Sequence, residues 1–532
     1  MPGLSRRLNR PAVAVLAVAA IAGVIRFAAI DDPRELVFDE LYYAKAGCVQ
    51  VTGASPDECR VDSSDERFWL ENEWDMGSWV HPPLGKLTVG LGIRMFSMSS
   101  FGWRFTSALA GIGVAVFTAL MAQVVFRRPV WTFVAGLLIA VDGLNVVQSR
   151  VALLDVHLAF WVTLGFLFFV LDRRWIDRRT DEATSRPAII AERPAGDEPD
   201  AVDEPEAVDE TGQTDPGLTP PTVRVPSPFF RPWRLAAGTA FGAAIAVKWS
   251  GAMAIPAAVL LTYLWETTHR RGGEGLSLGR AFSRSLGLET VGVVVAFALV
   301  PLIVYTLAWV PWFVHFEPSL ADFIEQHRNM WDYHRDLRAT ALDAKTDAFT
   351  PTHAYYSRAW TWIPMLRPVN YFVEDLGPDI RQILAIGNPV LFWGTMWTIP
   401  YCAWAWWRKR DWTPGLMVIA FTGLYVPWLL VSRPQFFFYA LPLTPFMALA
   451  AIYTLRDLAA AHLVIRDSET GEVALDPDTG EPAISRRRPY LPFVWGYVAA
   501  AVGLFLWMWP ILTAGRISDT MWKARVWFRG WT

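Results

Sequence analysis

Two adjacent carboxylates, Asp39 and Glu40, follow the first long apolar run of the chain and are framed by Phe38, Leu41 and Tyr42. A solvated acid pair at a helix end would have the same local sequence as a catalytic pair, so the local pattern leaves both interpretations open. At a bilayer surface, a carboxylate can act as the general base that takes a proton from a hydroxyl attacking a lipid-linked group. The rest of the chain has to decide between the two.

Further polar residues lie at the ends of apolar runs, where hydropathy does not explain them. A cation there can accept the charge of a departing lipid phosphate. Charges inside a bilayer cost about 2.5–3.5 kcal/mol each on insertion scales, so they are usually functional or paired. Mutual pairing or snorkelling would be a purely structural explanation for Arg104 and Asp155. Together with Asp39 and Glu40, the candidate site residues are His81, Arg104, Asp155, Lys248, Arg433 and Gln435.

The sequence has no P-loop, no Ser-His-Asp order and no Cys/His cluster with zinc-ligand spacing. Nucleotide hydrolysis therefore has no visible apparatus. We predict no cofactor and no metal site, although a divalent ion near Asp39 and Asp155 is left open. The net charge of −3 says little about partners, and we predict no nucleic-acid partner. The chemistry that fits the candidate residues is group transfer from a lipid phosphate.

The composition indicates a polytopic, all-α membrane protein. Of the 532 residues, 53% are hydrophobic and 19% are charged, against roughly 25% charged residues in soluble domains. Apolar runs of about 17–25 residues, long enough to cross a bilayer, recur along the chain. The many Trp (28) and Phe (32) residues are typical of interface belts, and pocket walls would explain them equally well.

Topology follows from placing the Lys/Arg-rich short loops on the cytoplasmic side. The first apolar run continues to about residue 30, so we interpret it as an uncleaved anchor rather than a signal peptide. The amino terminus is then cytoplasmic, and the candidate site residues fall on the external side. We predict about eleven spans, at about 11–30, 101–126, 130–147, 151–171, 233–249, 251–265, 287–312, 380–407, 414–431, 436–455 and 490–513.

The spans divide the chain into five parts. The first, 1–174, holds four spans and an external loop at 31–100, whose end at about 87–98 reads as an interfacial helix. An acidic cytoplasmic loop, 175–230, is predicted to be disordered. Spans five to ten and an external loop at 313–378 follow in 231–456, then a polar cytoplasmic insert, 457–489, and a last span with an external end, 490–532. Cys48 and Cys59 share the first external loop, and a disulfide and two free thiols both remain open.

Six motifs carry a resemblance to a known family. They are Phe38-Asp39-Glu40, His81-Pro82-Pro83-Leu84-Gly85-Lys86, Gly102-Trp103-Arg104, Arg150 through Leu154-Asp155, Lys248-Trp249, and Arg433-Pro434-Gln435-Phe436-Phe437-Phe438-Tyr439. In these motifs the chain resembles the protein O-mannosyltransferases, and its composition looks actinobacterial. The resemblance implies the GT-C fold and inverting transfer of mannose from polyprenyl-phosphate-mannose to Ser or Thr of exported proteins, at the outer face of the cell membrane. It leaves open whether the enzyme works with the protein export machinery.

The resemblance also implies roles for individual residues. Asp39 would be the general base, with Glu40 beside it, and Arg104 would suit the donor phosphate. His81 matches the family's loop motif, and His353 matches the external loop of bacterial members. For the aromatic stretch around His353, packing as an interfacial lid explains the sequence as well as substrate contact does. Residues 313–378 are too few for the β-trefoil domain of the eukaryotic members.

Two other function classes compete with this interpretation. A related GT-C transferase that modifies a lipid or a glycan would share the early carboxylate, the lipid-phosphate donor and the fold. A transporter would show inverted repeats and charges near the bilayer midplane. The sequence has no clear repeat, and its unexplained charges lie at one interface. We therefore favour an enzyme over a transporter.

Overall fold

The structure, a computed structural model, describes residues 10–53, 59, 80–185, 225–343, 348–351, 353–461 and 488–531. Most of the predicted acidic loop and of the 457–489 insert lies outside these residues. Both ends of the acidic loop are nevertheless structured, unlike the prediction. Helix α9 continues to Ser185, and residues 225–231 are held by polar contacts to neighbouring helices.

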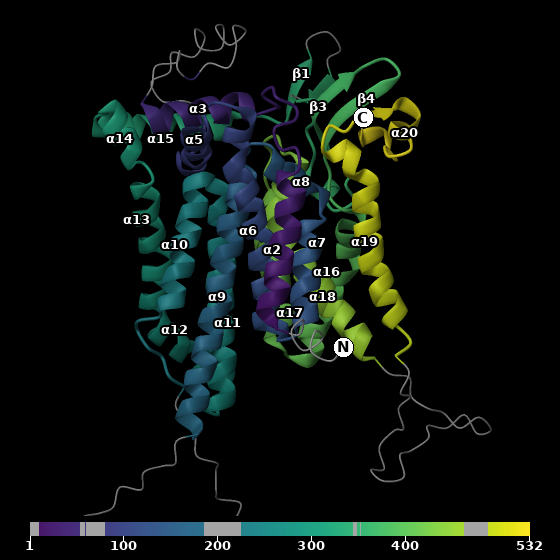
Figure 1. The fold of residues 1–532 in the computed structure, drawn as a ribbon. Helices are drawn as coiled ribbons and strands as arrows, with labels where there is room; N and C mark the ends of the chain where they lie inside the picture. Colours follow the sequence, from purple (N-terminus) through teal and green to yellow (C-terminus); the bar gives the residue numbers. More distant parts are fainter. Residues whose placement is uncertain are drawn as a thin grey trace, which may run out of the picture.

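Long helices run between the lower and upper ends of the molecule in Figure 1, and each predicted span overlaps at least one helix. By length and composition alone, six of the described helical stretches could cross a membrane, and the bent pair α7–α8 makes a seventh. The chain is therefore a multi-pass membrane protein. The helices of the spans are α2 (Pro11–Phe27), α6 (Ser100–Phe126), α7 (Pro129–Ala140), α8 (Gly143–Arg150), α9 (Leu154–Ser185), α10 (Pro232–Val247), α11 (Ala254–Gly273), α12 (Leu278–Val294), α13 (Val300–Leu307), α16 (Pro389–Lys409), α17 (Trp412–Leu429), α18 (Thr444–Ala460) and α19 (Leu491–Leu512).

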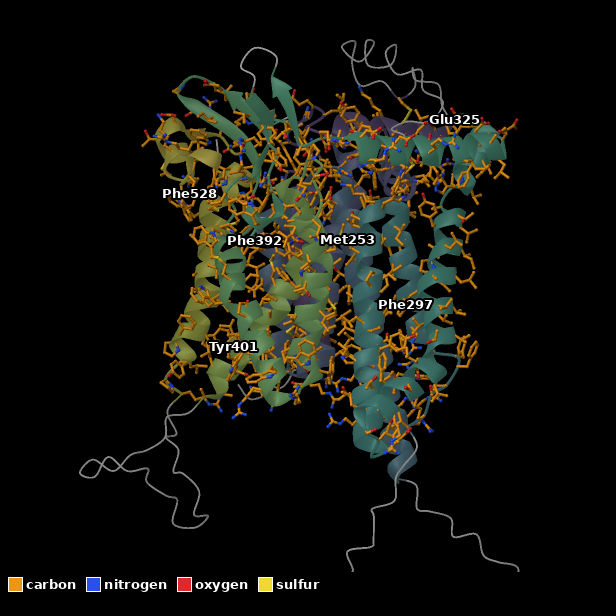
Figure 2. All side chains as sticks on the ribbon, turned by 180° about the vertical axis from the view of Figure 1, so that it is seen from behind. Met253, Phe297, Glu325, Phe392, Tyr401 and Phe528 are labelled. Carbon is orange, nitrogen blue, oxygen red and sulfur yellow. A yellow bond between two sulfur atoms is a disulfide. The ribbon has the colours of Figure 1, made fainter. Side chains whose placement is uncertain are left out.

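Large apolar side chains cover the long helices on both their inner and outer sides. Phe392 is fully buried and Phe297 nearly so, and both lie along the helical part of the molecule in Figure 2. On α12 and α13, apolar side chains also stay exposed, among them Val291, Leu302 and Leu307. An exposed apolar helix surface is what contact with lipid requires, since backbone polar groups are already paired within each helix.

The predicted third span is broken. Helices α7 and α8 meet at an angle of 60°. The Asp142 side chain starts α8 by accepting a hydrogen bond from the Asn145 backbone N–H at 3.0 Å. The break frees carbonyls at the end of α7, and the buried Arg26 donates to those of Ile139 and Ala140, at 3.5 Å each. Capping by polar side chains thus replaces the lost helical hydrogen bonds.

The eighth span was predicted to begin too early. Residues 379–385 form strand β4, and helix α16 begins only at Pro389, capped by the Asn388 side chain. β4 (Asp379–Ala385) pairs antiparallel with β3 (Val369–Asp375) and with β5 (Ile517–Ser518). The strand ends in apolar residues, and only Gly387 and Asn388 interrupt the apolar sequence before the helix, so a hydropathy window does not separate strand from helix. A second sheet pairs β1 (Thr340–Asp343) with β2 (Ala348–Pro351).

Three helices of the loops predicted to be external lie at the upper end of the molecule with the strands: α3 (Glu40–Thr52), α5 (Leu84–Phe96) and α15 (Leu320–Asp336). Helix α5 lies where the sequence predicts an interfacial helix, at about 87–98. It packs so closely on α3 that a Cβ on Gly90 would collide with the Gly47 carbonyl. Cys48 and Cys59 form a disulfide, with their Cα atoms 5.8 Å apart. The remaining short elements are α14 (Val310–Phe316), α20 (Asp519–Lys523), the 3-10 helices η3 (Trp249–Met253), η5 (Ala359–Thr361), η6 (Phe437–Leu443) and η7 (Arg529–Trp531), and the π turn η4 (Val295–Leu299).

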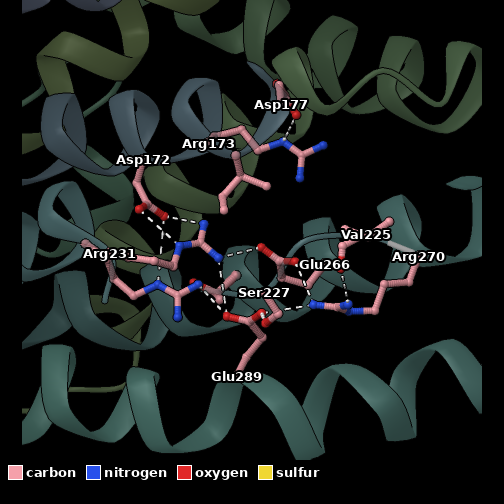
Figure 3. A network of polar contacts seen from close by, with 12 residues as sticks. Asp172, Arg173, Asp177, Val225, Ser227, Arg231, Glu266, Arg270 and Glu289 are labelled. Atoms are coloured by element: carbon pink, nitrogen blue, oxygen red, sulfur yellow. Dashed lines mark hydrogen bonds and ion pairs between the residues drawn. The ribbon is translucent and has the colours of Figure 1, made fainter. Parts of the chain in front are cut away.

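A buried network of charged side chains connects α9, α11 and α12, away from the upper end of the molecule (Figure 3). Arg231, just before α10, bonds to Asp172 of α9 at 2.5 Å, to Glu266 of α11 at 2.8 Å and to Glu289 of α12 at 3.3 Å. Arg270 also reaches Glu289, at 3.0 Å. Opposite charges from four segments thus compensate one another inside the bundle, as buried ions must.

Candidate active site

A cavity of about 550 Å³ opens at the upper end of the bundle, among the loops that carry α3, α5 and α15. It brings together five of the nine predicted site residues. These are Asp39, His81, Lys248, His353 and Arg433. A smaller cavity of about 220 Å³ adjoins it, because both are lined by His81, Lys248 and Arg433. The smaller one has a more apolar wall, which includes Trp249, Met253 and Trp428.

Asp39 is presented to the cavity by an unusual backbone. Phe38 adopts φ +54°, a conformation that bulky residues rarely take, and its ring stacks on Tyr371 with centroids 4.5 Å apart. Asp39 occupies the N-cap position of α3 but makes no capping hydrogen bond, and no described group is bonded to its carboxylate. Burial raises its pKa to about 6, against the opposing effect of Lys248. The carboxylate is thus free to accept a proton and more basic than usual.

Glu40, the neighbouring acid, points away from the cavity and is fully buried. Arg104 donates to its two oxygens at 2.8 Å each. The backbone N–H groups of Val37 and Ala152 donate to the same oxygens at 2.9 and 2.8 Å. The remaining N–H groups of Arg104 donate to three backbone carbonyls of the segment 30–35. The structure therefore does not bring Glu40 and Arg104 to the cavity, because each already satisfies the other.

Lys248 forms the second ion pair of the region. Its ammonium donates to both oxygens of Asp155, at 3.0 and 2.9 Å, and lies 4.9 Å from the centre of the Tyr439 ring. Asp155 lines only a small neighbouring void, whereas Lys248 lines both larger cavities. A direct pair between Arg104 and Asp155, the structural alternative considered above, is wrong, since each has its own partner.

Arg433 lines the same two cavities as Lys248 and is hydrogen-bonded to His334. Its Nη1 donates to His334 Nδ1 at 2.8 Å, and His334 Nε2 bonds to the Val80 carbonyl at 3.1 Å. The rings of His81 and His334 stack, with centroids 5.5 Å apart. Burial and the charge of Lys248 hold the pKa of His81 well below its usual value, so its ring is neutral.

The last two predicted residues differ in their surroundings. Gln435 is buried outside the cavity, where its amide nitrogen donates to the carbonyls of Trp428 and Val431 at 2.8 and 2.7 Å. Its oxygen accepts from the Ala359 N–H at 3.1 Å. His353 is exposed at the cavity edge, with its ring 4.9 Å from that of Phe436. Gln435 therefore holds backbone segments together by hydrogen bonds. Of these two residues, only His353 can contact a ligand in the cavity.

Two family models match the chain. Residues 16–184 match "Dolichyl-phosphate-mannose-protein mannosyltransferase", and residues 319–531 match "C-terminal four TMM region of protein-O-mannosyltransferase". The chain belongs to the protein O-mannosyltransferase family. The first model spans Asp39, His81, Arg104 and Asp155, and the second spans Arg433. The predicted family membership is thus confirmed.

Relatives in this family cover nearly the whole chain. A protein of Mycolicibacterium smegmatis (strain MKD8), named polyprenol-phosphate-mannose–protein mannosyltransferase, is 28% identical over 97% of this chain and 92% of its own length. One of the same name from Corynebacterium glutamicum is 24% identical over 88% of each. The solved protein O-mannosyltransferase Pmt1–Pmt2 complex of S. cerevisiae, bound to its sugar donor, aligns with a TM-score of 0.67, 13% identity and coverage of 98% and 92%. This likeness confirms the GT-C fold of the family.

Several cavity residues were absent from the predicted set. Tyr43, Tyr333 and His334 line the cavity but lie in segments outside the predicted spans, where polar and aromatic residues are ordinary. His334 had one signal, its spacing of seven residues from His327, which places both on one face of α15. Among the described residues, no group of three or more His, Cys, Asp or Glu side chains could hold a metal ion.

Proposed function

We propose that this protein transfers mannose from polyprenyl-phosphate-mannose to Ser or Thr hydroxyls of exported proteins. One observation carries the proposal. In the cavity of this family member, the Asp39 carboxylate has no hydrogen-bond partner among the described residues and lines the same walls as Lys248 and Arg433. The relatives that match nearly the whole chain are named protein mannosyltransferases, which favours a protein acceptor over the alternative of a lipid or glycan.

The reaction fits a single displacement. The acceptor hydroxyl oxygen attacks the anomeric carbon of mannose while the bond from that carbon to the phosphate oxygen breaks, which inverts the configuration. The proton of the hydroxyl passes to Asp39, and the bonding electron pair leaves with the polyprenyl phosphate. Lys248 and Arg433 stabilise this anion, which needs little general-acid help. Stabilisation of developing charge is usually the larger effect, and general base catalysis adds about 10²–10⁴-fold.

Supporting residues hold this arrangement in place. Asp155 fixes the Lys248 ammonium. The Glu40–Arg104 pair anchors the first residue of α3, directly after Asp39 at the N-cap position. We assign Glu40, Arg104, Asp155 and Gln435 to positioning rather than to substrate contact. His81 and His353 remain candidates for contact with the sugar or the acceptor, because both line the cavity.

We also propose that the cavity faces the outside of the plasma membrane and that the amino terminus is cytoplasmic. Basic pairs such as Arg127-Arg128 and Arg408-Lys409 lie at helix ends away from the cavity, as expected for the cytoplasmic side. The Cys48–Cys59 disulfide on the cavity side fits an oxidising compartment. Acceptor proteins would then reach the cavity after emerging from the export machinery.

The test is the fate of the sugar. Purified protein in liposomes receives polyprenyl-phosphate-[¹⁴C]mannose and a Ser/Thr-rich peptide, and label is followed into peptide and lipid fractions. We expect peptide-bound label and, in cells, secreted glycopeptides that disappear without the protein. Label that enters only lipid would establish the alternative transferase, and no transfer at all would refute both.

A further inference from the structure

Helix α15 lies at the upper end of the molecule (Figure 1), and its Tyr333 and His334 line the cavity. Phe323, His327, Met330 and His334 recur on one of its faces at the spacing of a helix, and Met330 between the two histidines is fully buried. Both histidine rings use both nitrogens. His327 bonds to the Phe323 carbonyl and to the Tyr305 hydroxyl, at 2.8 Å each. The face therefore connects α15 to other segments by directed hydrogen bonds.

The partners of His334 determine its protonation state. The Arg433 guanidinium can only donate, so the Nδ1 atom that meets it must carry a lone pair. The Val80 carbonyl can only accept, so Nε2 must carry the proton. His334 is thus the neutral Nε2–H tautomer. Burial and Arg433 agree with this assignment, since they lower its pKa to about 4.

Arg433 depends on this one contact for its orientation. Nη1 is the nitrogen that His334 holds at 2.8 Å. Nη2 reaches the Tyr439 hydroxyl only at 3.5 Å, and the buried Nε has no hydrogen-bond partner among the described residues. The Nε and Nη2 donors together form the edge of a guanidinium that grips a phosphate with two parallel bonds. His334 occupies Nη1, so the described residues leave the Nε donor of this edge unsatisfied and give Nη2 only the long Tyr439 contact.

We propose that His334 is a positioning residue that orients Arg433 so that its Nε–Nη2 edge binds the phosphate of the lipid-linked donor. The inference rests on the proposed function. Through Val80, His334 also links α15 to the loop that carries His81. The two external loops and the Arg433 segment therefore meet at one ring. No bond to His334 is made or broken in the reaction, so it acts only through Arg433.

Two substitutions separate the two hydrogen bonds of His334. His334→Asn places an amide oxygen near the former Nδ1 position, where it can still accept from Arg433. His334→Gln places its amide near the former Nε2 position, where it can reach Val80 but not Arg433. We expect His334→Gln and His334→Ala to raise the donor KM about tenfold or more and to leave the acceptor-peptide KM within about twofold, because a hydrogen bond to a charged group is lost. His334→Asn should stay near the wild type.

His327→Ala is the matched control, since it removes a histidine from the same face of α15 without touching Arg433. It should lower thermal stability as His334→Ala does but leave the donor KM unchanged. Inhibition by polyprenyl phosphate provides a second readout, and it should weaken in His334→Gln in parallel with the donor KM. Equal donor KM values in His334→Asn and His334→Gln would overturn the proposal.

A double-mutant cycle decides whether His334 acts through Arg433. In an Arg433→Ala background, His334→Ala should change the donor KM by less than about twofold, because the group that it positions is gone. Fully additive effects would overturn the proposal while wild-type transfer still upheld the function. A wild-type protein that transfers no mannose would instead contradict the proposed function itself.

Discussion

Arg104 and Glu40 are joined by two hydrogen bonds of 2.8 Å, and both side chains are buried behind the cavity that Asp39 lines. Backbone N–H groups from two other segments also converge on the Glu40 carboxylate. The ion pair therefore fixes the residue directly after the proposed base. Its charge is compensated internally, which leaves none for a substrate.

Glu40→Gln should separate a positioning role from phosphate binding. The substitution keeps the shape but leaves the buried Arg104 charge without its partner, and breaking a buried pair costs about 3–5 kcal/mol. We expect a large drop in thermal stability and in kcat, with a donor KM within about twofold of wild type. Thermal unfolding in detergent and steady-state kinetics measure these quantities. A selective rise in donor KM would place the pair at the donor phosphate after all.

Asp39→Asn should abolish the proton acceptor while keeping the side-chain shape. Turnover should fall by about 10²-fold or more, since general base catalysis is lost. Binding of polyprenyl phosphate, measured by competition, should persist. Because Asp39 has no described bonding partner, stability should change little. Near-normal turnover would require another base.

The pH profile of the wild type should show the raised pKa of Asp39. The base works as the carboxylate, so activity is present above its pKa and is lost as the pH falls through about 6. Below that value kcat/KM should drop about tenfold per pH unit, whereas an ordinary Asp would give this limb near pH ~4. Transfer assays between pH 5 and 8, with thermal stability checked at each pH, provide the test. A kcat/KM that stays flat down to pH 5 would contradict the raised pKa of this carboxylate in the working enzyme.

The sequence predicts the spans well because apolar runs and basic loops act over whole segments. It also places Asp39, Lys248 and Arg433 correctly at one end of the bundle. It cannot separate them from Arg104, because a charge paired inside the protein and a charge reserved for substrate give the same signal at the end of a span. Only the structure shows that Glu40 takes up the donors of Arg104.

Local hydropathy fails for a different reason at β4 and at His334. In β4 the last residues are apolar and buried, and only Ile386, Gly387 and Asn388 stand between them and Pro389, so one hydropathy window covers both strand and helix. His334 lies on a helix outside the predicted spans, where a histidine is unremarkable. Its partners, Val80 and Arg433, are 254 and 99 residues away in the sequence. Contacts at such separations are set by the tertiary fold.

The buried charge network should contribute to stability and not to chemistry (Figure 3). Arg231→Met leaves Asp172, Glu266 and Glu289 with uncompensated negative charge, which should cost about 3–5 kcal/mol. The activity of the folded fraction should stay within about twofold. Lys409→Met is the control, since Lys409 is exposed and pairs with Asp457 at 2.7 Å, and surface pairs contribute only about 0–1 kcal/mol. Equal losses of thermal stability in the two variants would show that the buried network contributes no more to stability than a surface ion pair.

Residues 186–224 should be dispensable for catalysis. They contain no aromatic residue and are rich in Pro, Asp and Glu, a composition that cannot bury a core. Replacing them with a Gly/Ser linker should leave kcat/KM within about twofold, because no contact to the reacting groups is removed. The deletion has to stop before Val225, whose N–H donates to Glu274 at 3.0 Å, and Ser227, whose hydroxyl donates to Glu289 at 2.5 Å. Extending it through Ser227 should lower thermal stability, whereas a large loss of activity from the shorter deletion, with stability intact, would reveal a regulatory role for this segment.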